Sequence, residues 1–376
     1  MSDPIEPTGP SEAQPSPLHA RHVALGAKFA SFGGWTMPLE YAGAGVLAEH
    51  TAVRSAVGIF DVSHLGKASV RGPGARAFLD QCLTADLGKI APGHAQYTLL
   101  CATDGGVVDD LIVYLRNDDD LLLVPNAANC ATVVSILAAA APRAVEVVDR
   151  HTAFALIAVQ GTESDEVLAD AGLPVGHDYM TFVELDRDGQ PVTVCRTGYT
   201  GERGYELIVP TAAAEGVWDA LMAAGEPYGL QPAGLGARDT LRTEMGYPLH
   251  GQDISPTITP VQARLGWAIG WRKPHFFGDA ALRAEKEAGP ARTLRGLKAV
   301  RRGIARPGMT VRSEGATEIG TVTSGTFSPT LKTGVALALV DSAAQLDDVV
   351  AVDIRGRLEP FVVTKPPFVS PRVRER

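Results

Sequence analysis

Two adjacent carboxylates, Asp109 and Asp110, stand in a stretch that otherwise has the composition of an interior β-strand, Val107–Arg116. The preceding Asp-Gly-Gly at 104–106 predicts a hairpin, because glycine adopts the positive φ that tight turns require. Side chains alternate across a strand, so Asp109 shares its face with aliphatic residues only. Asp110 shares the other face with Tyr114, an aromatic residue with a polar tip. We therefore expect Asp110, rather than Asp109, to face a ligand cleft.

Burying a carboxylate costs several kcal/mol unless it is hydrogen-bonded, paired or neutralised by a raised pKa. The strand alone leaves two interpretations open. In the structural one, both aspartates cap the hairpin or meet an arginine at the edge of the sheet. In the functional one, Asp110 acts in a site.

Length and composition exclude several classes. A chain of 376 residues predicts two or three domains, and 45% hydrophobic with 20% charged residues is typical of a soluble globular protein. A formal charge of -9 argues against non-specific nucleic-acid binding, which requires a basic surface. No apolar run approaches the roughly 18 residues of a membrane span. The sequence therefore predicts no nucleic-acid and no membrane partner.

The first 17 residues contain five prolines and no Arg or Lys, so we expect residues 1–17 to form a disordered tail. The four cysteines are far apart in the sequence and form no CxxC pair, so the sequence predicts neither disulfides nor a structural zinc site. Free thiols suit a reducing cytoplasm, which is the predicted location. His64 and His250 lack metal-ligand spacing, and no GxSxG motif supports a serine hydrolase.

The order of strand and helix signals predicts an α+β fold. Residues 63–150 alternate strands and helices with hairpins, which favours an antiparallel sheet, and a similar pattern restarts at Ala153. Residues 58–71 are expected to form one strand that enters this unit. From Gly289 onward, short strands with frequent glycines indicate a small β-barrel or sandwich. The boundary of this last domain is expected between Arg272 and Gly289.

A second hairpin is predicted over Arg196–Glu206, with glycines whose spacing fits neither a dinucleotide fingerprint nor a Walker loop. If Tyr205 packs in the core, Glu206 points to a cleft; a solvent-exposed Glu206 is the alternative. On the following helix, Arg238 lies on an apolar stripe, where arginine is rarely unpaired. Two kinds of partner are open. One is a carboxylate on the same helix, Asp239 or Glu244, and the other is Glu206 or an atom of a ligand.

Seven strings, in order along nearly the whole chain, resemble the glycine cleavage system T protein family of tetrahydrofolate-dependent aminomethyltransferases. They are Phe32–Leu39, Gly58–His64, Gly105–Tyr114, Asn126–Asn129, Arg196–Glu206, Gly234–Asp239 and Thr323–Thr330. Each string alone is a weak signal, but the ordered set is specific.

The resemblance implies a three-domain cloverleaf around a central cavity. Two α+β domains with antiparallel sheets would be followed by a C-terminal β-barrel or sandwich. The first, folate-binding domain would be discontinuous, with residues 18–62 and 151–272; the second, residues 63–150, would carry the catalytic hairpin; the barrel would comprise residues 273–376. Tetrahydrofolate would enter pterin first, and the lipoylated H protein would deliver the aminomethyl group. The products would be ammonia and 5,10-methylenetetrahydrofolate, with no metal required.

The resemblance also implies roles for individual residues. The catalytic carboxylate corresponds to Asp110, which would face N5 and N10 of the folate. Glu206 matches the amino and ring N–H groups of a pterin edge, and Arg238 matches its carbonyl. Further cavity-lining and supporting residues would be Tyr97, Tyr179, Tyr199, Trp267, Tyr114 and Asn126. The sequence departs from the family pattern at Leu65, Met180 and His250, which affects the packing of the folate.

Two other functions use a related fold. One is a non-catalytic folate-binding protein that assists iron-sulphur cluster assembly, but the functional cysteine of those relatives has no counterpart in residues 246–253. The other is the folate module of dimethylglycine or sarcosine oxidases, which requires a nucleotide-binding domain. This chain has neither the fingerprint nor the length for one.

Overall fold

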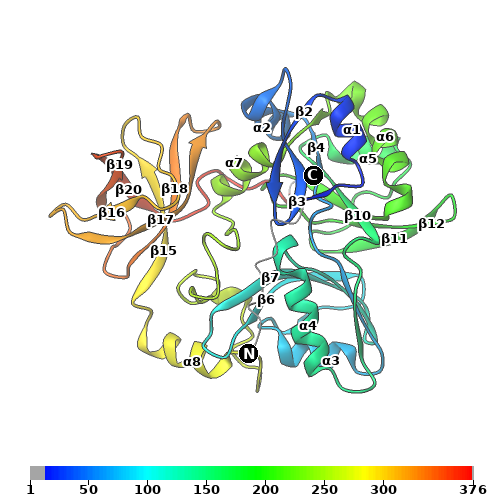
Figure 1. Cartoon of the computed structure of the whole chain (residues 1–376), viewed down its shortest axis with the longest axis horizontal. Coiled ribbons are helices and arrows are strands. Elements are labelled where there is room, and N and C mark those ends of the chain that lie inside the picture. Colours follow the sequence, from blue (N-terminus) through cyan, green and yellow to red (C-terminus); the bar gives the residue numbers. More distant parts are fainter. Residues whose placement is uncertain (1–12, 375–376) are drawn as a thin grey trace, which may run out of the picture.

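In the computed structural model, which describes residues 13–374, the chain forms three lobes (Figure 1). Two lobes combine helices with predominantly antiparallel sheets, and the third is a closed barrel. The predicted α+β class with a C-terminal barrel is therefore confirmed. Within the described residues, no helix is long and apolar enough to cross a membrane.

The first lobe contains residues from both sides of the second lobe in sequence. Its main sheet has the order β11-β12-β13-β10-β4-β14, and a smaller sheet has the order β1-β3-β2. The main strands are β4 (Gly58–Asp61), β10 (Phe154–Gln160), β11 (Phe182–Arg187), β12 (Gln190–Cys195), β13 (Gly204–Pro210) and β14 (Gln231–Pro232). The small sheet has β1 (Gln14–Pro15), β2 (Ala27–Phe32) and β3 (Trp35–Tyr41). Among the described strands of this lobe, only β14 with β4 and β1 with β3 pair in parallel.

The helices of the first lobe are α1 (His19–Ala24), α2 (Gly45–Ser55), α5 (Ser164–Asp170), α6 (Ala214–Gly225) and α7 (Leu235–Met245). Helices α5 and α6 cover one face of the main sheet, where Trp218 and Leu221 are buried against strand residues such as Ile157. The other face packs against α7 and against the second lobe, so the sheet stands between two apolar layers.

The second lobe is a five-stranded antiparallel sheet in the order β6-β7-β8-β5-β9. Its strands are β5 (Ala68–Arg71), β6 (His94–Cys101), β7 (Val107–Asn117), β8 (Asp120–Val124) and β9 (Glu146–Asp149), and its helices are α3 (Ala75–Cys82) and α4 (Cys130–Ala140). The aliphatic residues of β7 and β8 are buried together with residues of both helices.

The barrel has the strand order β15-β18-β17-β16-β19-β20. Its strands are β15 (Arg292–Ala299), β16 (Thr310–Arg312), β17 (Glu318–Ser328), β18 (Thr333–Asp341), β19 (Val349–Ile354) and β20 (Arg357–Thr364). Helix α8 (Asp279–Ala288) leads into it. Single-turn 3-10 helices lie at η1 (Leu87–Lys89), η2 (Ala127–Asn129), η3 (Thr211–Ala213), η4 (Glu226–Tyr228) and η5 (Gly266–Ala268).

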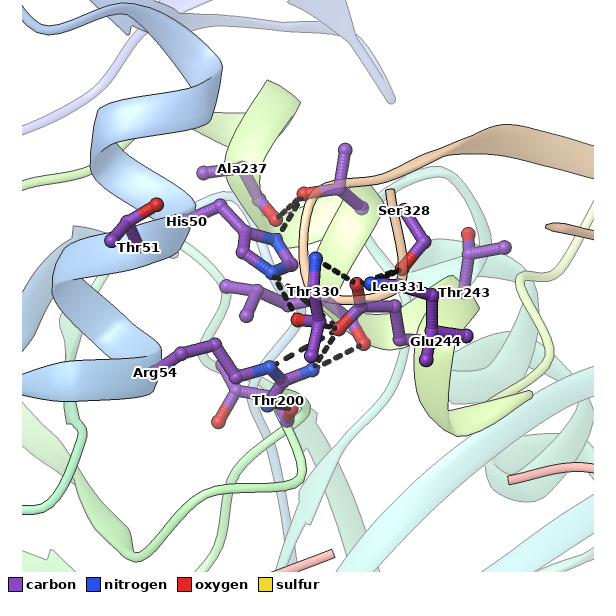
Figure 2. A network of polar contacts seen from close by, with 12 residues as sticks. His50, Thr51, Arg54, Thr200, Ala237, Thr243, Glu244, Ser328, Thr330 and Leu331 are labelled. Carbon is purple, nitrogen blue, oxygen red and sulfur yellow. Dashed lines mark hydrogen bonds and ion pairs between the residues drawn. The ribbon is translucent and has the colours of Figure 1, made fainter. Parts of the chain in front are cut away.

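A buried carboxylate joins the first lobe to the barrel (Figure 2). Glu244, at the end of α7, accepts a hydrogen bond of 2.8 Å from Arg54 of α2. It also accepts bonds of 2.5 Å from the hydroxyl of Ser328, the last residue of the barrel strand β17, and of 2.9 Å from the hydroxyl of Thr330 just beyond it. Burial raises the pKa of Glu244, but His50, whose Nε2 lies 3.4 Å from Oε2, and then Ser328 and Arg54 lower it to about 2.

Two expectations about local structure are wrong. Residues 13–17 of the predicted disordered tail are ordered, because β1 pairs with Trp35 and Thr36 and the Ser16 hydroxyl donates to Asp61. Residues 1–12 lie outside the described part. The single strand expected over 58–71 is two strands in different sheets, β4 and β5, so the chain passes from the first lobe to the second between them.

Candidate functional site

The aspartate pair lies on β7 as the alternation predicts. Strands β6 and β7 pair with Leu99 opposite Asp110 and Leu100 opposite Asp109. Asp109 is fully buried, whereas Asp110 is half-buried and, with Tyr114, lines a central cavity. The expectation that Asp110 faces a cleft is confirmed.

Asparagine amides, rather than an arginine, stabilise the two carboxylates. Asn126 donates its backbone N–H to Asp109 Oδ2 at 2.9 Å and its side-chain amide to Asp110 Oδ1 at 2.7 Å. Asn129 donates to Asp109 Oδ1 at 2.7 Å, and the Tyr97 hydroxyl donates to Asp110 Oδ2 at 3.0 Å. The structural interpretation, with hairpin caps or an edge arginine, is therefore wrong.

The ionisation of both aspartates is disfavoured. Burial, and secondly the charge of Asp110, raise the pKa of Asp109 to about 7. Burial also raises the pKa of Asp110, and the hydrogen bonds from Tyr97 and Asn126 oppose this shift. A carboxyl group with a raised pKa can hold or release a proton near neutral pH, as general acid-base chemistry requires.

Glu206, on β13 of the first lobe, lines the same cavity. Its neighbour Tyr205 is in the core, and Glu206 is 8% exposed, which confirms the predicted orientation. The Thr197 hydroxyl donates to Glu206 Oε2 at 2.5 Å. Because that hydroxyl has a single proton, the Tyr114 hydroxyl, 3.2 Å from it, is the donor in their contact.

Arg238 lies in this cavity without a carboxylate partner among the described residues. Its guanidinium carbon is 4.7 Å from the centre of the Tyr199 ring. The helix neighbours proposed as partners bind elsewhere: Asp239 pairs with Arg242 at 2.7 Å, and Glu244 pairs with Arg54. Burial lowers the pKa of Arg238, and Glu206 opposes that shift. Arg238 is thus available to a ligand atom, whereas the alternative of a direct ion pair with Glu206 is not formed.

Aromatic rings line the rest of the cavity. Tyr97 and Trp267 stack with their centres 5.4 Å apart, and Tyr199 stacks on Tyr247 at 5.7 Å. Trp267 is 71% exposed, so a large apolar surface is open at the cavity. All nine residues predicted for the site line this one cavity: Tyr97, Asp110, Tyr114, Asn126, Tyr179, Tyr199, Glu206, Arg238 and Trp267.

Sequence reasoning missed His64 as a lining residue. It is 2% exposed, its Nδ1 has no hydrogen-bond partner among the described residues, and it faces the same cavity. Burial, and secondly the charge of Arg238, lower its pKa to about 3, so the imidazole is neutral. Its place at the end of a string that resembles the family, Gly58–His64, was a signal that could have identified it.

His250, whose role the sequence left open, acts on the site indirectly, through Asn129 and Asp109. Its Nε2 contacts the Val107 carbonyl at 3.0 Å and its Nδ1 contacts the Asn129 amide at 2.9 Å. A carbonyl can only accept, so Nε2 carries the proton and Nδ1 accepts from Asn129. His250 thereby orients an amide that binds Asp109. No cluster of three His, Cys, Asp or Glu suited to a metal ion occurs in residues 13–374.

Comparisons with known proteins cover nearly the whole chain. One family profile, described as GCVT N-terminal domain, matches residues 18–273, and another, described as glycine cleavage T-protein C-terminal barrel domain, matches residues 292–370. The aminomethyltransferase of Frankia alni (strain DSM 45986 / CECT 9034 / ACN14a) is 62% identical over 354 residues, which cover 94% of this chain and 97% of that protein. The aminomethyltransferase of Mycobacterium tuberculosis (strain ATCC 25618 / H37Rv) is 58% identical over 360 residues, with coverages of 95% and 97%.

A solved structure, the glycine cleavage system aminomethyltransferase T from Bartonella henselae, superposes with a TM-score of 0.90 at 36% identity. The superposition covers 96% of this chain and 99% of that one. The match therefore includes all three lobes and the elements that form the central cavity.

Proposed function

The chain belongs to the glycine cleavage system T protein family and is an aminomethyltransferase, and from this premise we propose how its central cavity performs the transfer. The acceptor is tetrahydrofolate, and the donor is the aminomethyl-dihydrolipoyl arm of the H protein. The similar proteins are named aminomethyltransferases and give no support to the iron-sulphur assembly alternative. A cytoplasmic location is part of the proposal, supported by four free, buried cysteines.

Glu206 and Arg238 recognise the pterin edge. Glu206 uses Oε2 for Thr197, which leaves Oε1 to accept from the pterin amino and ring N–H groups. Arg238, held over the ring of Tyr199, donates to the pterin carbonyl. Charge-assisted hydrogen bonds of this kind are about twice as strong as neutral ones. The absence of an ion pair between Glu206 and Arg238 supports this assignment, since both groups remain available to the ligand.

Asp110 is the catalytic residue. In the reaction, N5 and N10 of the folate form bonds to the methylene carbon, while the carbon–nitrogen bond to the amine and the carbon–sulphur bond to the lipoyl arm break. Of the two protons lost from N5 and N10, one completes ammonia and the other the free thiol. Asp110 positions N5 toward the methylene carbon and accepts or returns a proton as ammonia leaves. Its raised pKa supports this role.

We also propose the domain limits. The first domain comprises residues 18–62 and 151–272, the second residues 63–150, and the barrel domain residues 273–376. Membership of β4 and β10 in one sheet, and of β5 to β9 in another, supports this division.

One observation carries the functional proposal: Asp110, Glu206 and Arg238, from three separate elements, line a single cavity. The test is to incubate the protein with aminomethylated H protein, with and without tetrahydrofolate, and to measure ammonia and methylenetetrahydrofolate. We expect folate-dependent release, and Asp110→Asn should lower the rate by about 10² to 10⁴ while folate still binds. Full turnover by Asp110→Asn would remove the catalytic assignment. A lack of folate-dependent release would favour the binding-protein alternative.

A further inference from the structure

The link between β4 and β5 contributes two side chains, His64 and Leu65, to the wall of the central cavity. The chain crosses from the first lobe to the second in this link. His64 is buried, and its Nδ1 has no hydrogen-bond partner among the described residues. Its ring meets the ring of Phe32 edge-on, with the centres 5.3 Å apart. Because buried polar atoms are nearly always satisfied by protein, water or ligand, this imidazole is suited to a polar group of the substrate.

Side chains bind every backbone carbonyl of the link from residue 63 to residue 65. The Lys67 ammonium donates to the carbonyls of Ser63 and Leu65, both at 2.8 Å. The carbonyl between them, that of His64, accepts from Nε2 of His151 at 2.8 Å. Most backbone carbonyls in proteins bond to other backbone groups instead. The three side-chain contacts together fix the direction in which His64 and Leu65 leave the backbone.

Lys67 occupies a costly position for an ammonium group. Its exposed fraction is 0%, and lysine is almost never fully buried unless it is paired. Removing an ammonium from water costs several kcal/mol, which its hydrogen bonds must offset. The cost falls on a segment that forms part of the cavity wall. Local arrangements that a neutral side chain could replace more cheaply are typical of functional sites.

A second buried lysine has the same arrangement away from the cavity. The Lys273 ammonium donates to the carbonyls of Leu83 at 2.7 Å and Ala85 at 2.8 Å. Residues 83–85, all of which the structure describes, are not part of the cavity wall. A comparison of the two lysines therefore separates the stabilisation of a turn from an effect on substrate binding.

We propose that Lys67 is a positioning residue for substrate binding, which acts through the backbone of residues 63–65 and directs His64 onto the folate. The inference rests on the proposed function. Lys67 has no exposed surface and cannot touch the substrate itself. His64 makes the contact, as a hydrogen bond to a polar group of the pterin, in the cavity that also contains Glu206 and Arg238.

A double-mutant cycle tests this proposal, with the affinity for tetrahydrofolate measured anaerobically by titration calorimetry on the full chain. His64→Phe and Lys67→Met should each weaken binding about tenfold, as the loss of one hydrogen bond predicts. The double variant should bind no more weakly than either single variant, because Lys67 acts through His64; independent effects would multiply to about 100-fold. The KM for folate should rise, whereas kcat at saturating folate should change little, since Asp110 is untouched.

Lys273→Met is the matched control. It should lower the free energy of unfolding, measured with urea, as Lys67→Met does, and keep the wild-type affinity for tetrahydrofolate. His151→Phe provides a second test that does not depend on the folding of Lys67→Met. It removes the bond to the His64 carbonyl and keeps an aromatic ring beside Trp35, whose centre lies 5.1 Å from that of His151. This variant should weaken folate binding severalfold.

Three results would overturn the proposal. The first is wild-type affinity in His64→Phe or in His151→Phe. The second is a Lys67→Met protein that is less stable but binds folate normally, which would give Lys67 a structural role only. The third is a double variant whose loss is the product of the two single losses. Failure of the wild-type chain to bind tetrahydrofolate would instead contradict the proposed function, so the two failures are distinguishable.

Discussion

One asparagine serves both members of the carboxylate pair. The side-chain amide of Asn126 lies 2.9 Å from Asp109 Oδ1 and 2.7 Å from Asp110 Oδ1, so the two carboxyl groups are held in a fixed relation. Asn129, in turn held by His250, provides a second amide to Asp109. Asp109 is therefore a positioning residue behind the cavity, and its proton affects the field that Asp110 experiences.

The raised pKa of Asp109 predicts a pH dependence of stability. The folded-state pKa of about 7 lies above that of an unfolded aspartate, so the folded state retains a proton that the unfolded state has lost. The free energy of unfolding should therefore fall as pH rises from about 4 to about 7, by up to about 4 kcal/mol from this group. Asp109→Asn removes this ionisation, and urea unfolding at several pH values should show a flatter profile.

The control for that measurement is Glu314→Gln, which changes an exposed acid in the barrel lobe and should leave the wild-type profile intact. A profile that Asp109→Asn does not alter would contradict the assignment of the ionisation to Asp109.

For single residues, the sequence predicted the direction of a side chain better than its hydrogen-bond partners. The period of two along a strand was sufficient to place Asp110 and Glu206 in the cavity, because each has a neighbour that must be buried. It could not identify the amides at 126 and 129, since those contacts depend on how β8 leads into the loop before α4. Arg238 illustrates the same limit: both of its proposed helix partners are occupied by arginines, at 242 and 54.

The turn of the β6–β7 hairpin in the second lobe packs against the backbone at Ser255 and Pro256. A Cβ atom added at Gly106 would lie 1.9 Å from the Pro256 carbonyl oxygen, so the backbones approach more closely than any other residue allows. The adjacent Val107 N–H donates to the Ser255 carbonyl at 2.9 Å. The turn thus fixes the strand that carries the aspartates against the segment that leads to the third lobe.

Gly106→Ala should displace this turn and with it Asp110. We expect a loss of about 1–3 kcal/mol in the free energy of unfolding, as overpacking costs, and a lower rate of ammonia release. Gly216→Ala in helix α6 is the matched control, because nothing lies within 4 Å of the added Cβ. That variant should be slightly more stable and fully active. Equal behaviour of the two alanine variants would show that the close approach at Pro256 does not position the strand.

Most elements could be predicted from the sequence because their period and turn residues agree. Of the two expectations that are wrong, the single strand over residues 58–71 has a physical cause that strand patterns do not show. The Lys67 ammonium donates to the carbonyls of Ser63 and Leu65, both at 2.8 Å, and closes a turn between β4 and β5. A lysine side chain that is buried to satisfy main-chain carbonyls has no signature in strand periodicity.

At the scale of the whole molecule, Glu244 lies where the first lobe meets the barrel. Its carboxylate binds Arg54 of α2 and Ser328 at the end of β17, as Figure 2 shows. Removing it leaves Arg54 with one remaining carboxylate, Glu202, and leaves His50 facing an empty position. The arrangement of the lobes itself was implied by family resemblance, because no strand or helix pattern states which faces of separate domains meet.

Glu244→Ala should cost about 3–5 kcal/mol, the range for breaking a buried ion pair. The wild-type pKa of about 2 lies below that of an unfolded glutamate, so this stability is present above about pH 4.5 and is lost as pH falls toward 2. Chemical unfolding should show a smaller acid-induced loss in the variant than in the wild type. Glu287→Ala, at an exposed position of α8, is the control and should behave like the wild type. If the free energy of unfolding falls equally at low pH in the wild type and in both variants, Glu244 is not the cause of the acid-induced loss.

The pairing of β4 with β10 has a consequence for biosynthesis. These neighbours in the main sheet are separated in the chain by the entire second lobe. The other partner of β4 is β14, at residues 231–232, which is synthesised later still. A ribosome therefore releases β4, the first strand of that sheet, with both of its apolar edges open, well before the complementary strands emerge. The intervening lobe has all of its own strands by residue 149 and can fold earlier. The nascent polypeptide is consequently most exposed to aggregation while β4 has no partner strand.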